Sequence, residues 1–312
     1  MDQAEKLRQL VKVKKTETVN ENGGPKTEEE AAAEHPKRTA KVIAVASGKG
    51  GVGKSNFTVN LAIELSKMGN RVMILDADLG LANADIILGI NPKYNLTHVI
   101  KDEMELRDII TETEYGVKLI ASGSGVKELA NLSNAQREKF ISKLAEVENM
   151  VDILLIDTGA GISRNTLSFI YASDYSVVIT TPEPTALMDA YGLIKVVSLS
   201  RNKVPLKLVV NMAGSKDEAK EIASRVVLLS RRFLNTFVES YGYILRDRNV
   251  LNSVMSQKPF TVLYPGARAS ACIKEIAQKV TDKYNKYYKG KKIREKGLFG
   301  RLFDIFRQSE ES

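Results

Sequence analysis

The strongest constraint on this chain comes from residues 41–58, KVIAVASGKGGVGKSNFT, where an apolar run meets a glycine-rich loop. The run Val42–Ala46 is typical of a buried strand. The next residues, Gly48–Ser55, fit the phosphate-binding pattern G-x-x-x-x-G-K-[ST]. A helical pattern with an apolar face follows the loop, so strand, loop and helix occur in the order that the pattern needs. We therefore expect a loop that binds nucleotide phosphates.

Each residue type of this loop has a chemical task. Glycines allow several backbone N–H groups to point at phosphate oxygens, and the following helix adds the positive end of its dipole. We expect Lys54 to reach the β and γ phosphates and Ser55 to hold Mg²⁺ through its hydroxyl. A plain glycine turn before a helix is the alternative, and the strand–loop–helix context argues against it. The predicted phosphate-binding residues are Gly48, Lys49, Gly50, Gly51, Val52, Gly53, Lys54, Ser55 and Asn56.

Further apolar runs recur along the chain, separated by helical patterns. Near-continuous apolar strands of this kind are typical of a mostly parallel sheet with helices on both faces. Ligands of such sheets bind at the carboxyl ends of the strands. The fold class is therefore predicted to be α/β. The predicted strands after the first are 72–75, 117–120, 153–156, 176–179, 206–210 and 241–245.

Polar residues follow several of these strands. Asp76 and Asp78 come after the second strand, and Asp157 ends the strand 153–156. An apolar strand that ends in Asp is typical of a Walker B carboxylate, which holds Mg²⁺ through water. The glycines after Asp157 can offer N–H groups to a γ-phosphate and so act as a switch. Helix capping remains open for Asp76 and Asp78, and a tight turn remains open for Asp157.

Composition limits the remaining possibilities. The 312 residues are 43% hydrophobic and 27% charged, which suits one large α/β core with tails. The chain has no apolar run near the roughly 20 residues that span a bilayer, no signal-peptide pattern at its start, and one cysteine, Cys272. We therefore expect a cytoplasmic protein without disulfides or a cysteine metal cluster. The net charge of +8 favours anionic partners.

Both ends of the chain differ from the centre. Residues 1–14 predict a short amphipathic helix, and the polar residues 15–40 predict a flexible linker before an ATPase domain at 41–288. Residues 289–312 predict a basic linker and an amphipathic helix that lies in a membrane interface. Docking of either helix on its own domain stays open as the alternative. The predicted membrane residues are Leu298, Phe299, Leu302, Phe303, Ile305 and Phe306.

The second lysine of the glycine loop makes it more specific. With Lys49 the loop reads KGGVGKS, which resembles the deviant Walker A box of the MinD/ParA family of dimerising ATPases. The resemblance implies that Lys49 crosses to the nucleotide of a second copy, like an arginine finger supplied in trans. It also implies that Asp78 orients the attacking water, that Asn211 and Asp247 contact adenine, and that ATP and Mg²⁺ are the cofactors. The implied catalytic residues are Lys49, Lys54, Asp78 and Asp157, and the implied Mg²⁺ residues are Ser55, Asp78 and Asp157.

Two further segments resemble one branch of that family, the flagellar FlhG proteins, also called YlxH or FleN. They are the start Asp2-Gln3-Ala4-x-x-Leu7-Arg8 and the run Thr158-Gly159-Ala160-Gly161 after the Walker B residue. The resemblance implies control of flagellar number and placement. It also implies that the N-terminal helix activates the GTPase FlhF, and that components of the flagellar switch complex (C-ring) are partners. The implied FlhF-binding residues are Asp2, Gln3, Leu7 and Arg8.

These expectations combine into one hypothesis. ATP pairs two copies as a homodimer, the pair holds the inner face of the cell membrane through anionic lipids, and hydrolysis releases both. A ParA-type ATPase that positions DNA is the main alternative, although the Phe-rich C-terminal helix argues against a nucleic-acid partner. An electron-transferring ATPase would need two cluster cysteines per subunit, and Cys272 stands alone. A non-enzymatic, nucleotide-gated adaptor is the third alternative.

Overall fold

The computed structural model describes residues 40–78, 83–121, 123, 143, 147–288 and 297–308. All of them belong to one unit, Thr39–Ser312. The predicted N-terminal helix (1–14) and nearly all of the predicted linker (15–40) therefore lie outside the described residues, and their structure stays a prediction.

An eight-stranded sheet forms the centre of the unit, in the order β3-β4-β2-β5-β1-β6-β7-β8. All neighbouring strands are parallel except β3 and β4, which pair antiparallel. The carboxyl ends of the parallel strands therefore meet at one edge, where β1 leads into the glycine loop. The strands are β1 (Lys41–Ser47), β2 (Val72–Ala77), β3 (Thr111–Glu112), β4 (Val117–Ala121), β5 (Ile153–Ala160), β6 (Tyr175–Thr180), β7 (Leu206–Ala213) and β8 (Val238–Leu245).

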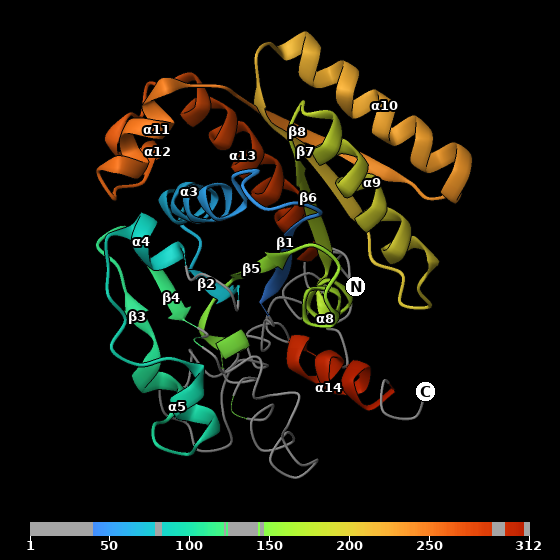
Figure 1. Cartoon of the computed structure of the whole chain (residues 1–312). Helices are drawn as coiled ribbons and strands as arrows, with labels where there is room; N and C mark the ends of the chain where they lie inside the picture. Colours follow the sequence, from blue (N-terminus) through green and yellow to red (C-terminus); the bar gives the residue numbers. More distant parts are fainter. Residues whose placement is uncertain are drawn as a thin grey trace, which may run out of the picture. The chain divides into compact units, whose positions relative to one another are not determined.

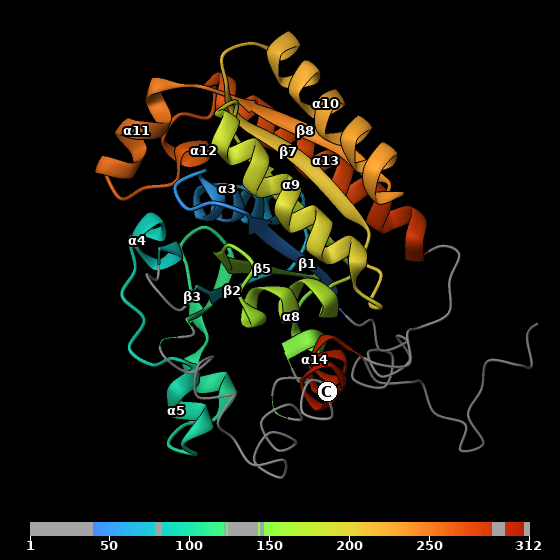
Figure 2. The same cartoon turned by 45° about the vertical axis from the view of Figure 1, so that its right-hand side comes forward.

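Helices cover both faces of this sheet. In Figure 1, α3 and α13 lie on one side of the central strands, and α8, α9 and α10 lie on the other. Figure 2 turns α9 and α10 toward the reader, with α13 behind the strands. The helices are α3 (Lys54–Lys67), α4 (Ala84–Leu88), α5 (Leu96–Ile100), the 3₁₀ helix η1 (Leu106–Ile109), α8 (Arg164–Ala172), α9 (Pro184–Leu199), α10 (Lys216–Leu234), α11 (Arg248–Met255), α12 (Phe260–Leu263), α13 (Arg268–Tyr288) and α14 (Leu298–Gln308).

The alternation of side chains along β1 shows why the sheet needs this double cover. Ile43 and Val45 join the apolar cluster that includes α3 and α13, whereas Ala44 and Ala46 join the cluster of α9 and α10. All four side chains are fully buried. Successive strand residues point to opposite faces, so a strand that is apolar at every position must have a helical layer on each side.

The predicted fold class is confirmed, and the predicted strands all occur with small shifts at their ends. The last strand starts three residues earlier than expected, at Val238. Strand β3 was not predicted, because a strand of two residues has no periodicity to detect. Among the described residues, every helix is too short or too polar to traverse a bilayer.

The C-terminal helix α14 is docked on its own domain. Leu298 and Leu302 are buried in an apolar cluster with Phe169 of α8, and Ile305 packs against that cluster. The Arg301 guanidinium donates to the carbonyl oxygen of Ala172 at 2.6 Å and to Asp174 Oδ1 at 3.4 Å. The structure thus holds the helix in the docked position that the sequence left open. The side chains of Phe299, Phe303 and Phe306 lie outside the described set.

Candidate functional site: a phosphate-binding loop with a buried lysine–carboxylate pair

The glycine loop is shaped by close contacts with two other elements. A Cβ on Gly48 would lie 2.1 Å from the backbone oxygen of Asp189 in α9. A Cβ on Gly53 would lie 2.4 Å from the side-chain nitrogen of Asn211, and Gly53 also has a left-handed backbone, with φ of 85°. The α9 backbone therefore leaves no room for a side chain at Gly48, and the left-handed backbone disfavours one at Gly53. The loop therefore owes its shape to α9 and β7, which press on it from two sides.

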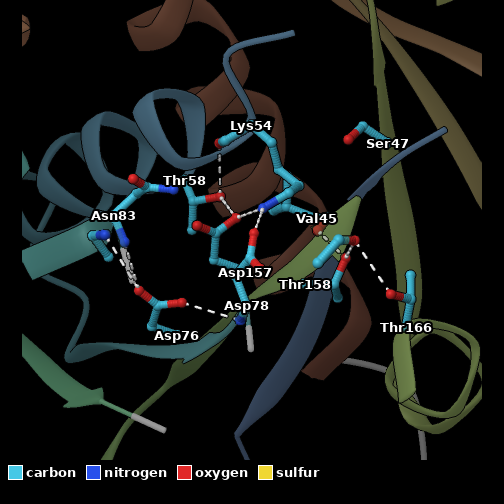
Figure 3. A network of polar contacts seen from close by, with 12 residues as sticks. Val45, Ser47, Lys54, Thr58, Asp76, Asp78, Asn83, Asp157, Thr158 and Thr166 are labelled. Atoms are coloured by element: carbon cyan, nitrogen blue, oxygen red, sulfur yellow. Dashed lines mark hydrogen bonds and ion pairs between the residues drawn. The ribbon is translucent and has the colours of Figure 1, made fainter. Parts of the chain in front are cut away.

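Lys54 begins α3 and points at carboxylates that come from two neighbouring strands. Its Nζ atom lies 2.7 Å from Oδ1 of Asp157, within β5, and 3.9 Å from Oδ2 of Asp78, just after β2 (Figure 3). Thr58, one turn along α3, donates to the same Asp157 oxygen at 3.4 Å. Three residues predicted to be catalytic, from positions far apart in the sequence, are thus brought together at the carboxyl edge of the sheet.

Asp157 is fully buried, and its second carboxylate oxygen has no hydrogen-bond partner within the described part of the chain. Burial raises the pKa of this carboxyl group, and the Lys54 ammonium opposes the shift. A buried oxygen without a partner fits a role in binding a cation, since such atoms are otherwise costly. The described residues hold no group of three or more His, Cys, Asp or Glu side chains that forms a cation cage alone. Mg²⁺ in nucleotide sites needs only one or two carboxylates beside phosphates and water, so the residues present fit it.

Asp76 has a different task from its neighbour Asp78. Its carboxylate accepts the backbone N–H groups of Asp78 at 3.1 Å, Asn83 at 3.3 Å and Ala84 at 3.2 Å. Burial, followed by the nearby Asp157 charge, raises the Asp76 pKa to about 7. Asp76 therefore fastens both ends of the segment between β2 and α4 (Figure 3). This is the capping alternative that the sequence left open for this residue.

Lys49 lies at the exposed rim of the loop and contacts the start of α9. Its Nζ atom lies 3.2 Å from Glu183 Oε2 and donates to Thr185 Oγ1 at 2.9 Å. Sequence reasoning missed both partners, because Glu183 lies 134 positions away and has no motif of its own. Within one copy, the predicted trans-acting lysine is thus held by its own chain.

A largely apolar pocket opens beside the loop, lined by Gly53, Phe57, Val250 and Phe260 among others. Asn211 and Asp247, the two residues predicted to contact adenine, are among its lining residues, and both side chains already have local partners. The Asn211 amide donates to the Val52 carbonyl at 2.8 Å and accepts the Met212 N–H at 2.9 Å. The Asp247 carboxylate caps α11 by accepting the Asn249 N–H at 3.0 Å. Both residues therefore brace the pocket, and base contact stays a prediction for each.

The run after Asp157 connects the lysine–carboxylate pair to α8. Thr158 and Gly159 still belong to β5, so the strand is longer than predicted. The Thr166 hydroxyl of α8 donates to the Gly159 carbonyl at 3.2 Å, and a Cβ on Gly159 would lie 3.7 Å from Asp78 Oδ1. Gly161 has φ of 88° and turns the chain toward α8. A shift of the backbone at residues 158–161 would therefore change the surroundings of both Asp78 and Thr166 of α8 (Figure 3).

The structure places the remaining predicted residues as follows. Gly50, Gly51, Val52, Ser55 and Asn56 lie in the loop and the first turn of α3. Asn56 lines the apolar pocket, and its buried side-chain oxygen has no hydrogen-bond partner among the described residues. The predicted FlhF-binding residues Asp2, Gln3, Leu7 and Arg8 lie outside the described residues.

Comparisons with known proteins agree with this geometry. The family model described as "ParA: NUBPL iron-transfer P-loop NTPase" matches residues 38–281. Antiactivator FleN of Pseudomonas aeruginosa is 38% identical over 246 residues, covering 79% of this chain and 87% of FleN. Flagellum site-determining protein YlxH of Helicobacter pylori is 34% identical over 278 residues, covering 88% of this chain and 89% of YlxH.

The fold has solved counterparts as well. The septum site-determining protein MinD of Pyrococcus horikoshii, solved in complex with Mg-ADP, superimposes with a TM-score of 0.63 at 23% identity. The match covers 77% of this chain and 96% of that one. Taken with the glycine loop and its lysine–carboxylate pair, these matches show that the chain belongs to the MinD/ParA family of P-loop NTPases, in its FleN/YlxH (FlhG) branch.

Proposed function

We propose that this protein is a MgATP-dependent switch ATPase that dimerises, binds the membrane reversibly and regulates flagellar number and placement. The observation that carries the proposal is the convergence of Lys54, Asp78 and Asp157 beside a phosphate loop that bears a second, exposed lysine, Lys49. Lys54 serves the chain's own nucleotide, and Lys49, at the exposed edge of the phosphate loop, is available for the nucleotide of a second copy.

Nucleotide binding would begin with an exchange of partners at Lys54. The Lys54 ammonium now neutralises the buried Asp157 carboxylate at 2.7 Å. A triphosphate in the loop offers stronger negative charge to the same ammonium. Mg²⁺, when bound, supplies positive charge that offsets the phosphate oxygens during transfer. Ser55, Asp78 and Asp157 would hold it, so Asp157 stays neutralised when Lys54 turns to the phosphates.

Hydrolysis requires a group that orients the attacking water. Asp78 fits this role because its carboxylate lies near Lys54 and borders Gly159, on the side where a γ-phosphate is expected. Asp76 positions it, since the Asp76 carboxylate accepts the Asp78 N–H. Lys49 of a second copy would complete the site in trans.

Dimerisation would join two copies at the face that carries the loop. Ile162, beside Gly161, and Met188, in the first turns of α9, are exposed apolar side chains next to the loop. Their burial between two copies would stabilise the pair by about 25 cal/mol per Å² of apolar surface. Lys49 must leave Glu183 to cross, and an exposed ion pair of this kind costs at most about 1 kcal/mol to break.

The docked helix α14 supports a reversible membrane switch. It packs on α8, and α8 begins three residues after Gly161, where the run that follows Asp157 ends. A change of that run on ATP binding would reach the docking surface through the Thr166 contact with Gly159. Released helices on a dimer act together, so two weak lipid contacts become one firm contact.

The flagellar role rests on the relatives, whose names describe an antiactivator and a flagellum site-determining protein. We extend it to this chain because the two matches cover most of its length. The N-terminal helix, with Asp2, Gln3, Leu7 and Arg8, would activate an FlhF-type GTPase, and flagellar switch components would be further partners. A pull-down with residues 1–15 as bait tests the FlhF part directly.

The enzymatic part is tested by ATP turnover of the full chain with and without anionic vesicles. We expect the ATP turnover per protein molecule to rise with protein concentration, and we expect it to be lost in Lys49→Ala and Asp78→Ala. Vesicle sedimentation should be stronger with ATP than with ADP. Equal sedimentation in both nucleotides would refute the membrane switch, and a salt-sensitive DNA shift without vesicle binding would favour the ParA-type alternative.

A further inference from the structure

Two connections enter neighbouring strands at the amino-terminal edge of the sheet. Residues 199–205 lead from the end of α9 into β7, and residues 231–237 lead from the last turn of α10 into β8. Because β6, β7 and β8 are adjacent and parallel, the two connections lie side by side. This edge is opposite the one that carries the phosphate loop. We call the two segments the amino-terminal rim.

The rim exposes large apolar side chains that no described element covers. Leu199 is 72% exposed, Phe233 is 63% exposed and Phe237 is 76% exposed. Phe233 lies on the side of α10 that carries the buried Val226 and Ser230, yet its own side chain is exposed. Two exposed phenylalanines and a leucine on one edge are more than the isolated apolar residues of an ordinary surface.

Charge at the rim has a single sign. Residues 199–205 contain Arg201 and Lys203, residues 231–237 contain Arg231 and Arg232, and neither segment contains Asp or Glu. Arg201, Lys203, Arg231 and Arg232 are all exposed. The Arg232 guanidinium lies 5.5 Å from the centre of the Phe233 ring, so positive charge and apolar surface are interleaved. This pattern complements a surface that is both anionic and apolar.

The docking place of α14 lies at the same edge. Arg301 contacts Ala172 and Asp174, the residues just before β6, and β6 is two strands from β8. The amphipathic helix and the rim therefore meet any flat surface from the same end of the domain. In Figure 2, the ends of α9 and α10 and the helix α14 all lie toward the lower part of the view, away from the phosphate loop.

From these observations we propose that the amino-terminal rim is a second lipid-contact surface, which inserts Phe233 and Phe237 into the interface of an anionic bilayer. The proposal rests on the membrane binding of the proposed function and deepens it. Stable anchoring of a peripheral protein takes two signals, because a single short apolar segment binds only marginally. The helix α14 supplies one signal, and the rim supplies the other.

A tryptophan reporter tests the contact at one residue. The chain contains no tryptophan, so Phe237→Trp in the full chain gives a single emission signal. With non-hydrolysable ATP, Mg²⁺ and vesicles of equimolar phosphatidylglycerol and phosphatidylcholine, we expect a blue shift and quenching by brominated lipid. The control is Leu228→Trp, since Leu228 is also an exposed apolar residue of this region, at 63%, but lies on α10 and faces away from the sheet. The control should neither shift nor be quenched.

Charge variants test the same surface by affinity. Arg231→Gln/Arg232→Gln should weaken vesicle binding roughly tenfold or more and leave ATP turnover in solution unchanged. Replacement of phosphatidylglycerol by phosphatidylcholine should remove the difference between variant and wild type.

The outcomes separate this proposal from the proposed function. If a Phe306→Trp reporter in α14 is quenched by brominated lipid while Phe237→Trp is not, the rim proposal is overturned and the membrane switch stands. Unchanged affinity in the arginine variant also overturns it, and would leave an acidic protein as the occupant of the rim. If wild-type protein binds no vesicles with ATP, both proposals fail together.

Discussion

At the scale of single residues, Gly48 shows how the loop depends on contacts outside its own motif. A Cβ at this position would press on the backbone of Asp189, which cannot rotate away. We expect Gly48→Ala to lower the free energy of unfolding by about 1–3 kcal/mol and to weaken nucleotide binding. Thermal unfolding and titration with a fluorescent ATP analogue would measure the two effects.

Gly50 provides the matched control, since a Cβ there meets no atom within 4 Å and its backbone is not left-handed. Gly50→Ala should leave the unfolding temperature of the nucleotide-free protein within about 1 °C of wild type. Equal destabilisation by both variants would show that the contact with α9 does not shape the loop.

The raised pKa of Asp76 makes the free energy of unfolding fall as the pH rises. Its pKa is about 7 in the folded protein and 3.8 as an ordinary carboxyl. The folded state therefore keeps a proton that the unfolded chain has lost, and the resulting stability is present below about pH 4 and disappears as the pH rises through 7. Asp76→Asn cannot titrate, so wild type should lose up to about 4 kcal/mol relative to this variant over that range.

Urea unfolding of the nucleotide-free and Mg²⁺-free proteins, at intervals from about pH 5 to pH 8, measures this difference. The variant also loses one hydrogen-bond acceptor, which changes its free energy of unfolding by the same amount at every pH. Two stability curves that stay parallel across this range would contradict the burial-raised pKa.

Much of the candidate site could be predicted because its residues sit in short motifs. Lys54 and Ser55 follow from the loop pattern, and Asp157 follows from its place at the end of an apolar strand. The roles of Asp76 and Glu183 could not be predicted. A strand-end Asp can bind metal or cap a helix, and only the positions of the N–H groups of Asp78, Asn83 and Ala84 decide between them. Glu183 acquires its contact with Lys49 from tertiary packing alone.

At the scale of elements, α14 is the part whose position the sequence left open. Its apolar face suits a membrane and a protein surface equally well, because both remove the same side chains from water. The choice in this structure comes from long-range partners, namely Phe169 of α8 and the acceptors of Arg301. The apolar periodicity of the α14 sequence predicts none of these partners.

Arg301 is therefore a direct test of the docked state. Arg301→Lys keeps the charge but loses the planar group that reaches Ala172 and Asp174 together. We expect this variant to bind anionic vesicles several-fold more strongly than wild type in the presence of ADP, because the docked helix is held less firmly. Sedimentation with vesicles measures the change.

Arg225→Lys is the control for that variant, since Arg225 is exposed on α10 and pairs with Glu221 of the same helix. It should behave like wild type in both nucleotides. If Arg301→Lys also behaves like wild type with ADP, then the contacts of Arg301 do not restrain the helix.

At the scale of the whole molecule, the sequence predicted the architecture because the apolar strands are nearly continuous and alternate with helices. A parallel sheet with two helical layers is the arrangement that buries such strands. The strand order β3-β4-β2-β5-β1-β6-β7-β8 could not be predicted from the runs themselves, since any buried strand can neighbour any other. That order is what brings Asp78 and Asp157 to Lys54.

The whole account depends on nucleotide-driven pairing of two copies, with Lys49 leaving Glu183 for the partner's nucleotide. Sedimentation velocity of the full chain with non-hydrolysable ATP and Mg²⁺ tests this most directly. We predict the mass of a dimer for wild type, with a single copy for Lys49→Ala and for wild type with ADP. A wild-type protein that is saturated with the ATP analogue and still sediments as a single copy would contradict the account.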